Sequence, residues 1–244
     1  MISRCIVLLL AAVVLTEAGV INTLQDTVVE KAEAAGLKAS TNLHRSKRQA
    51  DGACQQADII LVLDSSGSIG EDNWLKVLNF TKTMVLSFPV SPTDVRFGVA
   101  VYGNRATVAF NLNSYNDSDA YLDAIDEIGW KDQATNTSGG IRLMYRDMFT
   151  EENGDRAGIP NLGIVITDGA SNRDENLTIP EADKAREEDI LMFALGIGDA
   201  TVISELNGIG NDPDEDFVFE VEGFESLNSI KEQLVTAACE AAAA

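Results

Sequence analysis

The chain is poor in the side chains that nucleophilic enzymes and soft-ligand metal centres commonly use. Its 244 residues contain one histidine, His44, and three cysteines, Cys5, Cys54 and Cys239. His44 and Cys5 lie in residues 1–48, which the signals described below predict to be removed. A processed chain therefore lacks Ser-His-Asp groups, Cys-His groups and His-ligated zinc sites, and we expect it not to be an enzyme.

Basic side chains are also scarce. The sequence has 18 Lys and Arg against 39 Asp and Glu. Residues 1–48 hold six of the basic and four of the acidic residues, so residues 49–244 carry a net charge of −23. Such a surface repels nucleic acid and anionic lipid, and it favours cations, basic partners or mineral ions. We therefore expect no nucleic-acid partner.

The amino-terminal segment has the features of a secretory leader. Arg4 precedes an apolar stretch from Cys5 to Leu15, and Thr16-Glu17-Ala18 follows with small residues where a signal peptidase cuts. The apolar stretch is too short to span a bilayer and no second candidate follows it, so we predict no membrane span. Residues 1–18 are predicted to be a signal peptide of a secreted protein.

Residues 19–48 form a polar stretch that ends in Arg45-Ser46-Lys47-Arg48. This Arg-x-Lys-Arg pattern resembles the cleavage site of furin-like convertases, which predicts a propeptide at 19–48 that is cut after Arg48. A solvated basic linker is the alternative interpretation. The remaining residues, 49–244, are within the range of a single domain with a sizeable core.

Cys54 and Cys239 bracket this domain. In an oxidising compartment, two cysteines at these positions most simply join the two ends of the domain in a disulfide. Unpaired thiols and intermolecular pairing are the alternatives.

Strand-like and helix-like segments alternate along the domain. Apolar runs of strand length lie at Asp58–Leu63, Val95–Tyr102, Thr107–Leu112, Leu162–Thr167, Ile190–Gly196 and Phe217–Val221. Helical spacing lies at Trp74–Phe88, Ala120–Ile128, Gly140–Phe149, Pro180–Glu188, Val202–Leu206 and Leu227–Ala238. This alternation predicts an α/β fold with a doubly wound, mostly parallel six-stranded sheet and helices on both faces. The short link Gly103-Asn104-Arg105 leaves no room for a helix, so one edge strand is expected to be antiparallel.

Oxygen-bearing side chains follow three of the predicted segments. Asp64, Ser66 and Ser68 come after the first strand, and Asp168 ends another buried strand. Thr135 belongs to a hydroxyl-rich loop, 134–140, that begins a helix. Ligands of open α/β sheets bind beyond the carboxyl ends of the strands. Mg²⁺ takes oxygen ligands in near-octahedral geometry and keeps positions for water or a partner.

Each of these segments has a purely structural alternative. Ser68 with Glu71 would form a capping box, Thr135 or Thr137 would be an N-cap, and Asp168-Gly169 would be a strand-end turn. Their joint occurrence, in this order and at strand ends, favours a divalent-cation site over these alternatives.

The motifs Asp64-x-Ser66-x-Ser68, Thr135-Asn136-Thr137 and Thr167-Asp168-Gly169, together with the segment 194–200, resemble the von Willebrand factor type A domain. This domain is called the I domain in integrins, and the resemblance covers about Asp58 to Cys239. A standalone domain with its own leader is similar to the secreted, matrilin-like matrix members of the family.

The resemblance implies a Rossmann-like fold with a metal-ion-dependent adhesion site (MIDAS). By motif position, it implies that five residues hold Mg²⁺ or Mn²⁺, with Ca²⁺ as a further alternative: Asp64, Ser66, Ser68, Thr135 and Asp168. It also implies that an acidic side chain of an extracellular-matrix partner, collagen-type or other, completes the metal shell.

The chain departs from the collagen-binding members of the family at two places. Ala170 follows Asp168-Gly169 where those members commonly carry an acidic residue. The segment from Ser171 to Pro180 leaves little room for the extra short helix that they insert. These departures argue against collagen binding in the integrin manner.

Four asparagines lie in Asn-x-Ser/Thr sequons. In a secreted protein, Asn116, Asn176 and Asn79 are candidates for glycosylation. Asn136 lies inside the predicted metal loop, where a glycan would obstruct the site, so we expect it to remain unmodified.

The leading hypothesis is a secreted extracellular-matrix or adhesion protein that binds its partner through this metal site. The alternative is a structural matrix or biomineral-associated component whose acidic surface binds Ca²⁺. A phosphatase with Asp64 as nucleophile is disfavoured, because Ser66 stands where the haloacid-dehalogenase pattern has a second aspartate. Gly196-Ile197-Gly198 lacks the rest of a dinucleotide loop, and the acidic run 212–216 lacks calcium-loop spacing.

Overall fold

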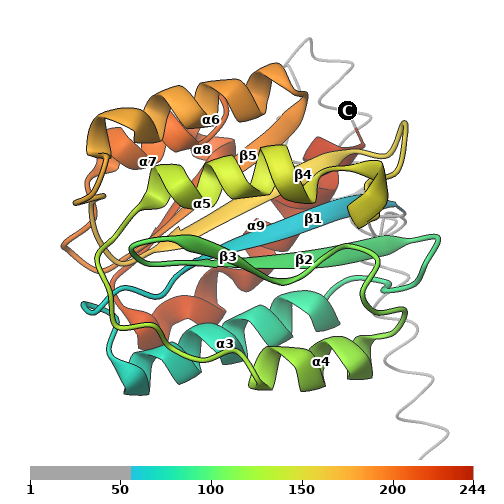
Figure 1. The fold of residues 1–244 in the computed structure, drawn as a ribbon, viewed down its shortest axis with the longest axis horizontal. Coiled ribbons are helices and arrows are strands. Elements are labelled where there is room, and N and C mark those ends of the chain that lie inside the picture. The colour runs from blue at the N-terminus through green and yellow to red at the C-terminus, as the bar shows by residue number, and fades with distance from the viewer. Residues whose placement is uncertain (1–55, 244) are drawn as a thin grey trace, which may run out of the picture. The chain divides into compact units, whose positions relative to one another are not determined.

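The computed structural model describes residues 56–243. Six strands form one sheet in the order β3-β2-β1-β4-β5-β6. They are β1 (Ala57–Asp64), β2 (Val95–Tyr102), β3 (Ala106–Phe110), β4 (Asn161–Thr167), β5 (Ile190–Ile197) and β6 (Val218–Val221). All neighbouring strands are parallel except β2 and β3. The predicted doubly wound sheet with one antiparallel edge strand is therefore confirmed (Figure 1).

Helices cover both faces of the sheet (Figure 1). The helices α3 (Glu71–Leu86), α4 (Ser118–Asp126) and α9 (Leu227–Ala242) pack on one face. The helices α5 (Thr137–Leu143), α6 (Thr178–Glu187) and α7 (Ile203–Ile209) pack on the other. The shorter elements are α8 (Asp214–Phe217), the π-helix η1 (Met144–Met148) and the 3-10 turns η2 (Glu151–Asn153), η3 (Glu175–Leu177) and η4 (Phe224–Ser226).

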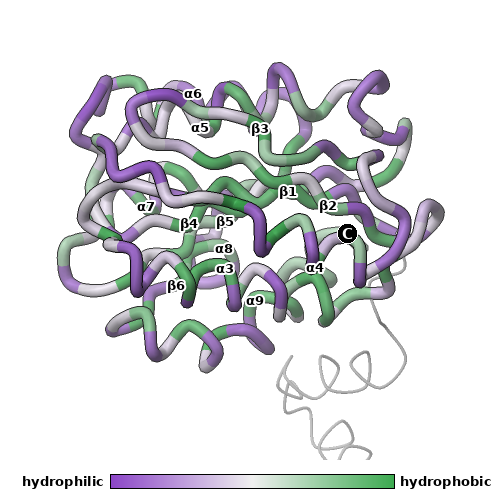
Figure 2. Tube along the Cα trace, turned by 60° about the horizontal axis from the view of Figure 1, so that its bottom comes forward, coloured by the Kyte–Doolittle hydropathy of each residue, from purple (hydrophilic) through white to green (hydrophobic). Residues whose placement is uncertain are grey.

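The sheet separates two hydrophobic cores. Along β1, Ile59 and Leu61 belong to the core beneath α3, whereas Ile60 and Val62 belong to the core beneath α5. Every residue of β1 is buried, which agrees with the unbroken apolar run at residues 59–63. Figure 2 shows the same arrangement, with hydrophobic strands inside and hydrophilic turns along the outer helices.

Most predicted bounds differ from the observed ones by a few residues, and two of the differences have a clear local cause. The segment predicted as one helix, Gly140–Phe149, begins earlier, because the Asn136 side chain caps α5 by accepting from the Gly139 N–H. After Leu143 it changes to the π-helix η1. The edge strand ends at Phe110 instead of Leu112. There the Asn111 N–H donates to Ser114 Oγ at 3.0 Å and starts a turn.

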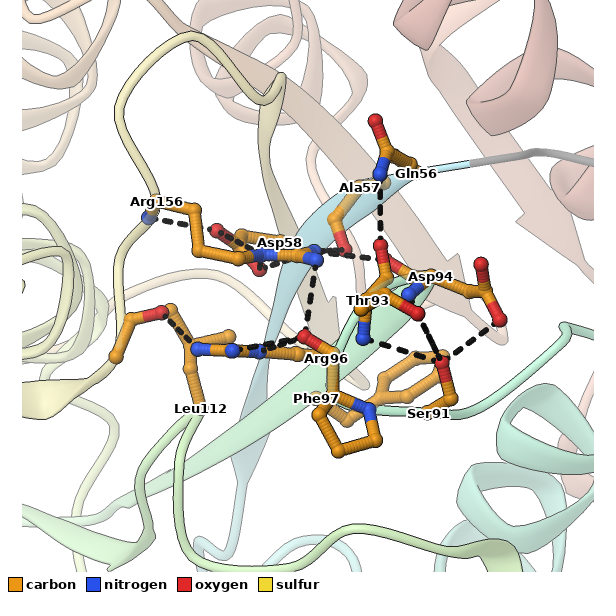
Figure 3. Close-up of polar contacts among 12 residues, drawn as sticks. Gln56, Ala57, Asp58, Ser91, Thr93, Asp94, Arg96, Phe97, Leu112 and Arg156 are labelled. Carbon is orange, nitrogen blue, oxygen red and sulfur yellow. Dashed lines mark hydrogen bonds and ion pairs between the residues drawn. The ribbon is translucent and has the colours of Figure 1, made fainter.

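Arg156 fastens the edge where the parallel strands begin (Figure 3). Its guanidinium lies 2.8 Å from Asp58 Oδ1, and the Asp58 side chain is fully buried. The same guanidinium donates to the carbonyls of Ala57 at 3.0 Å and Asp94 at 2.7 Å. Burial raises the pKa of Asp58, and Arg156 opposes that rise. One cation therefore joins the loop after η2 to the starts of β1 and β2.

Several predictions concern residues outside the described range: the leader 1–18, the propeptide 19–48, the cut after Arg48, His44 and Cys54. Cys239 forms a disulfide, and its predicted pairing with Cys54 stays a prediction. Within residues 56–243, no helix is both long and apolar enough to cross a membrane.

Candidate metal centre

Asp64 and Thr167 are neighbours at the carboxyl edge of the sheet, which we define as the edge where β1, β2, β4 and β5 end. Asp64 is the last residue of β1, and Thr167 is the last residue of β4. The Thr167 hydroxyl donates to Asp64 Oδ2 at 2.7 Å. Because both strands are buried and apolar up to these residues, the sheet itself fixes the position of the Asp64 carboxylate.

Four of the five predicted ligands are joined by one chain of hydrogen bonds. The Ser66 N–H donates to Asp64 Oδ1 at 2.8 Å. The hydroxyls of Ser66 and Ser68 are 3.0 Å apart, and Ser68 Oγ donates to Asp168 Oδ1 at 2.9 Å. Asp64, Ser66 and Asp168 are buried, whereas Ser68 is exposed. The fold thus brings together oxygen atoms from two loops that are far apart in the sequence.

Ser68 does not cap the helix that follows it. The N-cap of α3 is Gly70, whose φ of 71° suits glycine, and no side chain caps this helix. The capping-box interpretation of Ser68 with Glu71 is therefore wrong. The Ser68 hydroxyl is directed to Asp168 instead.

The fifth predicted ligand, Thr135, is buried and held through its backbone. Its N–H donates to Asn172 Oδ1 at 2.9 Å. Its carbonyl accepts from the N–H groups of Asn172 and Arg173 at 3.1 and 3.2 Å, and from Ser171 Oγ at 3.2 Å. Segment 171–173 follows Asp168 by a few residues, so the backbone of Thr135 is fastened to the loop that carries Asp168.

Neither threonine of this loop is a helix cap. Asn136 is the N-cap of α5, and Thr137 is its first helical residue. Asn136 is buried, and its side chain also accepts from Ser138 Oγ at 2.9 Å. The N-cap interpretation of Thr135 and Thr137 is therefore wrong.

Burial disfavours the charged forms of the Asp64 and Asp168 carboxylates. Burial raises the pKa of Asp64 to about 6, and the charge of Asp168 adds to the rise, although hydrogen bonds from Thr167 and Ser66 lower it. Burial also raises the pKa of Asp168, against the hydrogen bond from Ser68. A bound cation would stabilise both charged forms.

The donor set fits a small, hard divalent cation. Carboxylate and hydroxyl oxygens are the ligands that Mg²⁺ and Mn²⁺ prefer. In the part of the chain that the structure describes, no three or more His, Cys, Asp or Glu side chains are grouped to hold a metal. The proposed centre at the carboxyl edge would instead combine two carboxylates, Asp64 and Asp168, with neutral hydroxyls.

Thr167 belongs to one of the sequence motifs, but the motif assigns it no role, and Tyr102 belongs to none of the motifs. Tyr102 is the last residue of β2 and pairs in register with Asp64. The signal in the sequence was its place at the end of a predicted strand, although only the strand order puts it beside Asp64.

The predicted glycosylation sites and the acidic run 212–216 are not among the proposed metal ligands. Asn79, Asn116 and Asn176 are exposed, as a glycosylated asparagine must be. Glycosylation at these sequons stays a prediction. The acidic run 212–216 forms the turn before α8 and part of that helix.

The motifs of this site occur in a known family. The von Willebrand factor type A domain matches residues 58–233. Mouse collagen alpha-4(VI) chain is 32% identical over 192 residues, covering 77% of this chain and 8% of the relative. Mouse matrilin-2 is 29% identical over 187 residues, covering 75% of this chain and 19% of the relative. This chain thus spans less than a fifth of the length of either relative.

A solved structure of proximal thread matrix protein 1 from the mussel byssus, with a zinc-occupied MIDAS motif, has the same fold. It aligns with a TM-score of 0.71 at 28% identity, covering 77% of this chain and 47% of that one. The family match includes the loops of Asp64, Thr135 and Asp168. The chain belongs to the von Willebrand factor type A domain family.

Proposed function

We propose that this protein is a secreted extracellular-matrix or adhesion protein that binds a partner protein through a divalent cation. Five residues hold Mg²⁺ or Mn²⁺: Asp64, Ser66, Ser68, Thr135 and Asp168. A carboxylate of the partner completes the coordination shell. The observation that carries the proposal is the hydrogen-bonded chain from Asp64 through the serine hydroxyls to Asp168.

The neutral ligands explain why the cation would bind an acidic group of a partner. Ser66, Ser68 and Thr135 contribute oxygen atoms without charge, so Asp64 and Asp168 alone offset the charge of the cation. An acidic side chain from outside is then attracted to the remaining position. This arrangement supports binding, and we propose no catalysed reaction.

The location follows from the relatives and from the amino-terminal signals. The relatives named above include a collagen, a matrilin and a byssal thread matrix protein, which supports a place in the extracellular matrix. The leader at 1–18, the propeptide at 19–48 with its cut after Arg48, and the bond between Cys54 and Cys239 belong to the same proposal.

The partner is a matrix protein that presents an acidic side chain. Ala170 supplies no acidic group beside Asp168. Between Ser171 and α6 the chain forms only the three-residue turn η3. We therefore propose recognition that differs from collagen binding in the integrin manner.

A structural matrix component that binds Ca²⁺ or mineral is the second candidate. The net charge of −21 for the whole chain favours it. In that case assembly would depend on the acidic surface as a whole and be insensitive to the loss of Asp64.

A pull-down from extracellular-matrix extract separates the two candidates. The protein secreted by expressing cells is immobilised with Mg²⁺ and again with EDTA, alongside Asp64→Ala and Ser68→Ala. Ser68 is exposed, so its variant keeps the fold if Asp64→Ala does not. Asp147→Ala, at an exposed position of η1, is the matched control. Capture that needs Mg²⁺ and both ligand residues supports adhesion, and capture indifferent to EDTA and to both variants contradicts it.

A further inference from the structure

The proposed ligand Asp64 lies between two buried side chains at the ends of the neighbouring strands. Tyr102 on β2 pairs in register with Asp64 on β1, and Thr167 ends the strand on the other side of β1. Residues in register on parallel strands point to the same face of the sheet. That face is covered by α5, because a Cβ added at Gly140 would lie 2.9 Å from the Tyr102 ring.

Two hydroxyls at this place are buried without a partner. The side chains of Tyr102 and Thr137 are fully buried, and neither hydroxyl makes a hydrogen bond in the structure. Burial raises the pKa of Tyr102 well above its usual range, the charge of Asp64 adds to the rise, and the nearby hydroxyls of Thr167 and Thr137 oppose it. The geometry agrees with this proximity. Tyr102 is in register with Asp64, and Thr137 lies one helical turn before Gly140, whose backbone packs against the Tyr102 ring.

A buried hydroxyl without a hydrogen-bond partner lowers the stability of the folded protein. A residue that serves packing alone would have no need of such a hydroxyl. Replacing such a group by an apolar one of the same shape is neutral or stabilising. Phenylalanine at 102 would fill the same space among Val62, Ala100 and Ile141 in the core beneath α5. The hydroxyl thus contributes little to packing, which points to the neighbouring carboxylate as the reason for its presence.

We propose that Tyr102 is a positioning residue of the metal centre: its hydroxyl, with those of Thr137 and Thr167, forms a buried polar layer that orients the Asp64 carboxylate for a divalent cation. This inference rests on the proposed function. Outer-shell groups of this kind fix the orientation of metal ligands, and their loss typically weakens metal binding.

A pair of tyrosine variants tests the proposal. Tyr121 is the matched control, because it is also fully buried but lies on the other face of the sheet. Its hydroxyl accepts from the Phe97 N–H at 3.2 Å and donates to the Leu112 carbonyl at 3.4 Å. Mn²⁺ affinity is measured by titration calorimetry, and the thermal midpoint of the metal-free protein is measured in EDTA.

The expected results are opposite for the two variants. Tyr102→Phe is expected to raise the Mn²⁺ dissociation constant on the order of tenfold, with the metal-free midpoint unchanged or higher. Tyr121→Phe is expected to lower the midpoint and leave Mn²⁺ affinity unchanged. Thr137→Val removes the second hydroxyl at similar volume and is expected to behave like Tyr102→Phe, which keeps the test decisive if that variant does not fold.

Three outcomes overturn the inference. Equal Mn²⁺ affinity of the wild-type protein and Tyr102→Phe overturns it and leaves the proposed function standing. A parallel fall of affinity and midpoint in Tyr102→Phe shows a general structural role and overturns it as well. No Mn²⁺ uptake by the wild-type protein overturns the proposed function and this inference together.

Discussion

The carboxylate of Glu181 on α6 is nearly buried and is held by three side chains. Arg142 and Lys184 each donate to Glu181 Oε1 at 2.9 Å, and the Tyr145 hydroxyl donates to Oε2 at 2.7 Å. Burial by itself would raise the pKa of Glu181, but the hydrogen bonds outweigh it and lower the pKa to about 2. This residue therefore joins α6 to α5 and η1 in a charge-dependent way.

A carboxyl group whose pKa is lower in the folded state than in the unfolded state stabilises the protein at pH values above the unfolded-state pKa. This stabilisation is lost as the pH falls through the folded-state pKa. We predict that Glu181→Gln lowers the free energy of unfolding by about 2 kcal/mol at pH 7, allowing for solvent around Arg142 and Lys184. The difference from wild type should shrink from about pH 5 downward and vanish only below the folded-state pKa of about 2.

Urea unfolding at a series of pH values measures this difference. Glu187→Gln, at an exposed position on the same helix, is the control and should unfold like the wild-type protein at every pH. A difference between Glu181→Gln and wild type that stays constant from pH 7 to pH 2 would contradict the prediction.

At the level of residues, the sequence predicted the positions of the proposed ligands at strand ends more securely than the position of the one in a loop before a helix. Asp64 and Asp168 follow buried apolar runs, so their place at the carboxyl edge follows from the fold class alone. Thr135 lies in a loop whose position depends on hydrogen bonds to Ser171 and Asn172, which no local pattern reveals. Tyr102 required the strand order and the register.

At the level of elements, the start of the sheet depends on one buried ion pair. Removing Arg156 would leave the Asp58 carboxylate without its cation in a fully buried place. Breaking such a pair from one side typically costs about 3–5 kcal/mol. We predict a loss of this size for Arg156→Ala, together with lost protection from hydrogen exchange in β1 and β2.

Chemical denaturation in EDTA gives the free energy of unfolding for this comparison. Arg146→Ala, at an exposed position of η1, is the matched control and should change it by less than about 0.5 kcal/mol. A loss below 1 kcal/mol for Arg156→Ala would mean that the pair carries little of the fold's stability.

Hydrophobic periodicity sufficed for the order and type of the main elements, because strands covered on both faces are continuously apolar. It did not show where α5 begins or where it changes to a π-helix. The start of α5 depends on the side chain of Asn136. The π-helix places Met144 against Gly163, a contact between segments distant in sequence.

At the level of the whole molecule, cation binding should be linked to stability. A ligand that binds only the folded state stabilises it by about 2.7 kcal/mol at a concentration 100 times its dissociation constant. We predict that saturating Mg²⁺ raises the thermal midpoint of the wild-type protein and that EDTA reverses the change. The exposed Ser68 allows a clean comparison, because Ser68→Ala should keep its midpoint in EDTA and gain less from Mg²⁺.

Differential scanning calorimetry at matched ionic strength measures the midpoints. Ionic strength must be matched because added salt also screens the repulsion among the acidic side chains of this strongly negative chain. An equal gain with MgCl₂ for Ser68→Ala and the wild-type protein would assign the effect to the general acidic surface and count against the centre at the carboxyl edge.

The start of β1 and the end of α9 both lie on the side of the sheet away from the carboxyl edge (Figure 1). β1 ends at Asp64, so its first residue, Ala57, lies at the opposite edge. α9 begins after β6 and returns across the sheet to Ala242. A sensor surface, a fluorophore or a force probe attached beyond Ala242 would therefore leave the loops of Asp64 and Asp168 facing the solution, which makes carboxyl-terminal immobilisation the orientation of choice for measuring partner affinity.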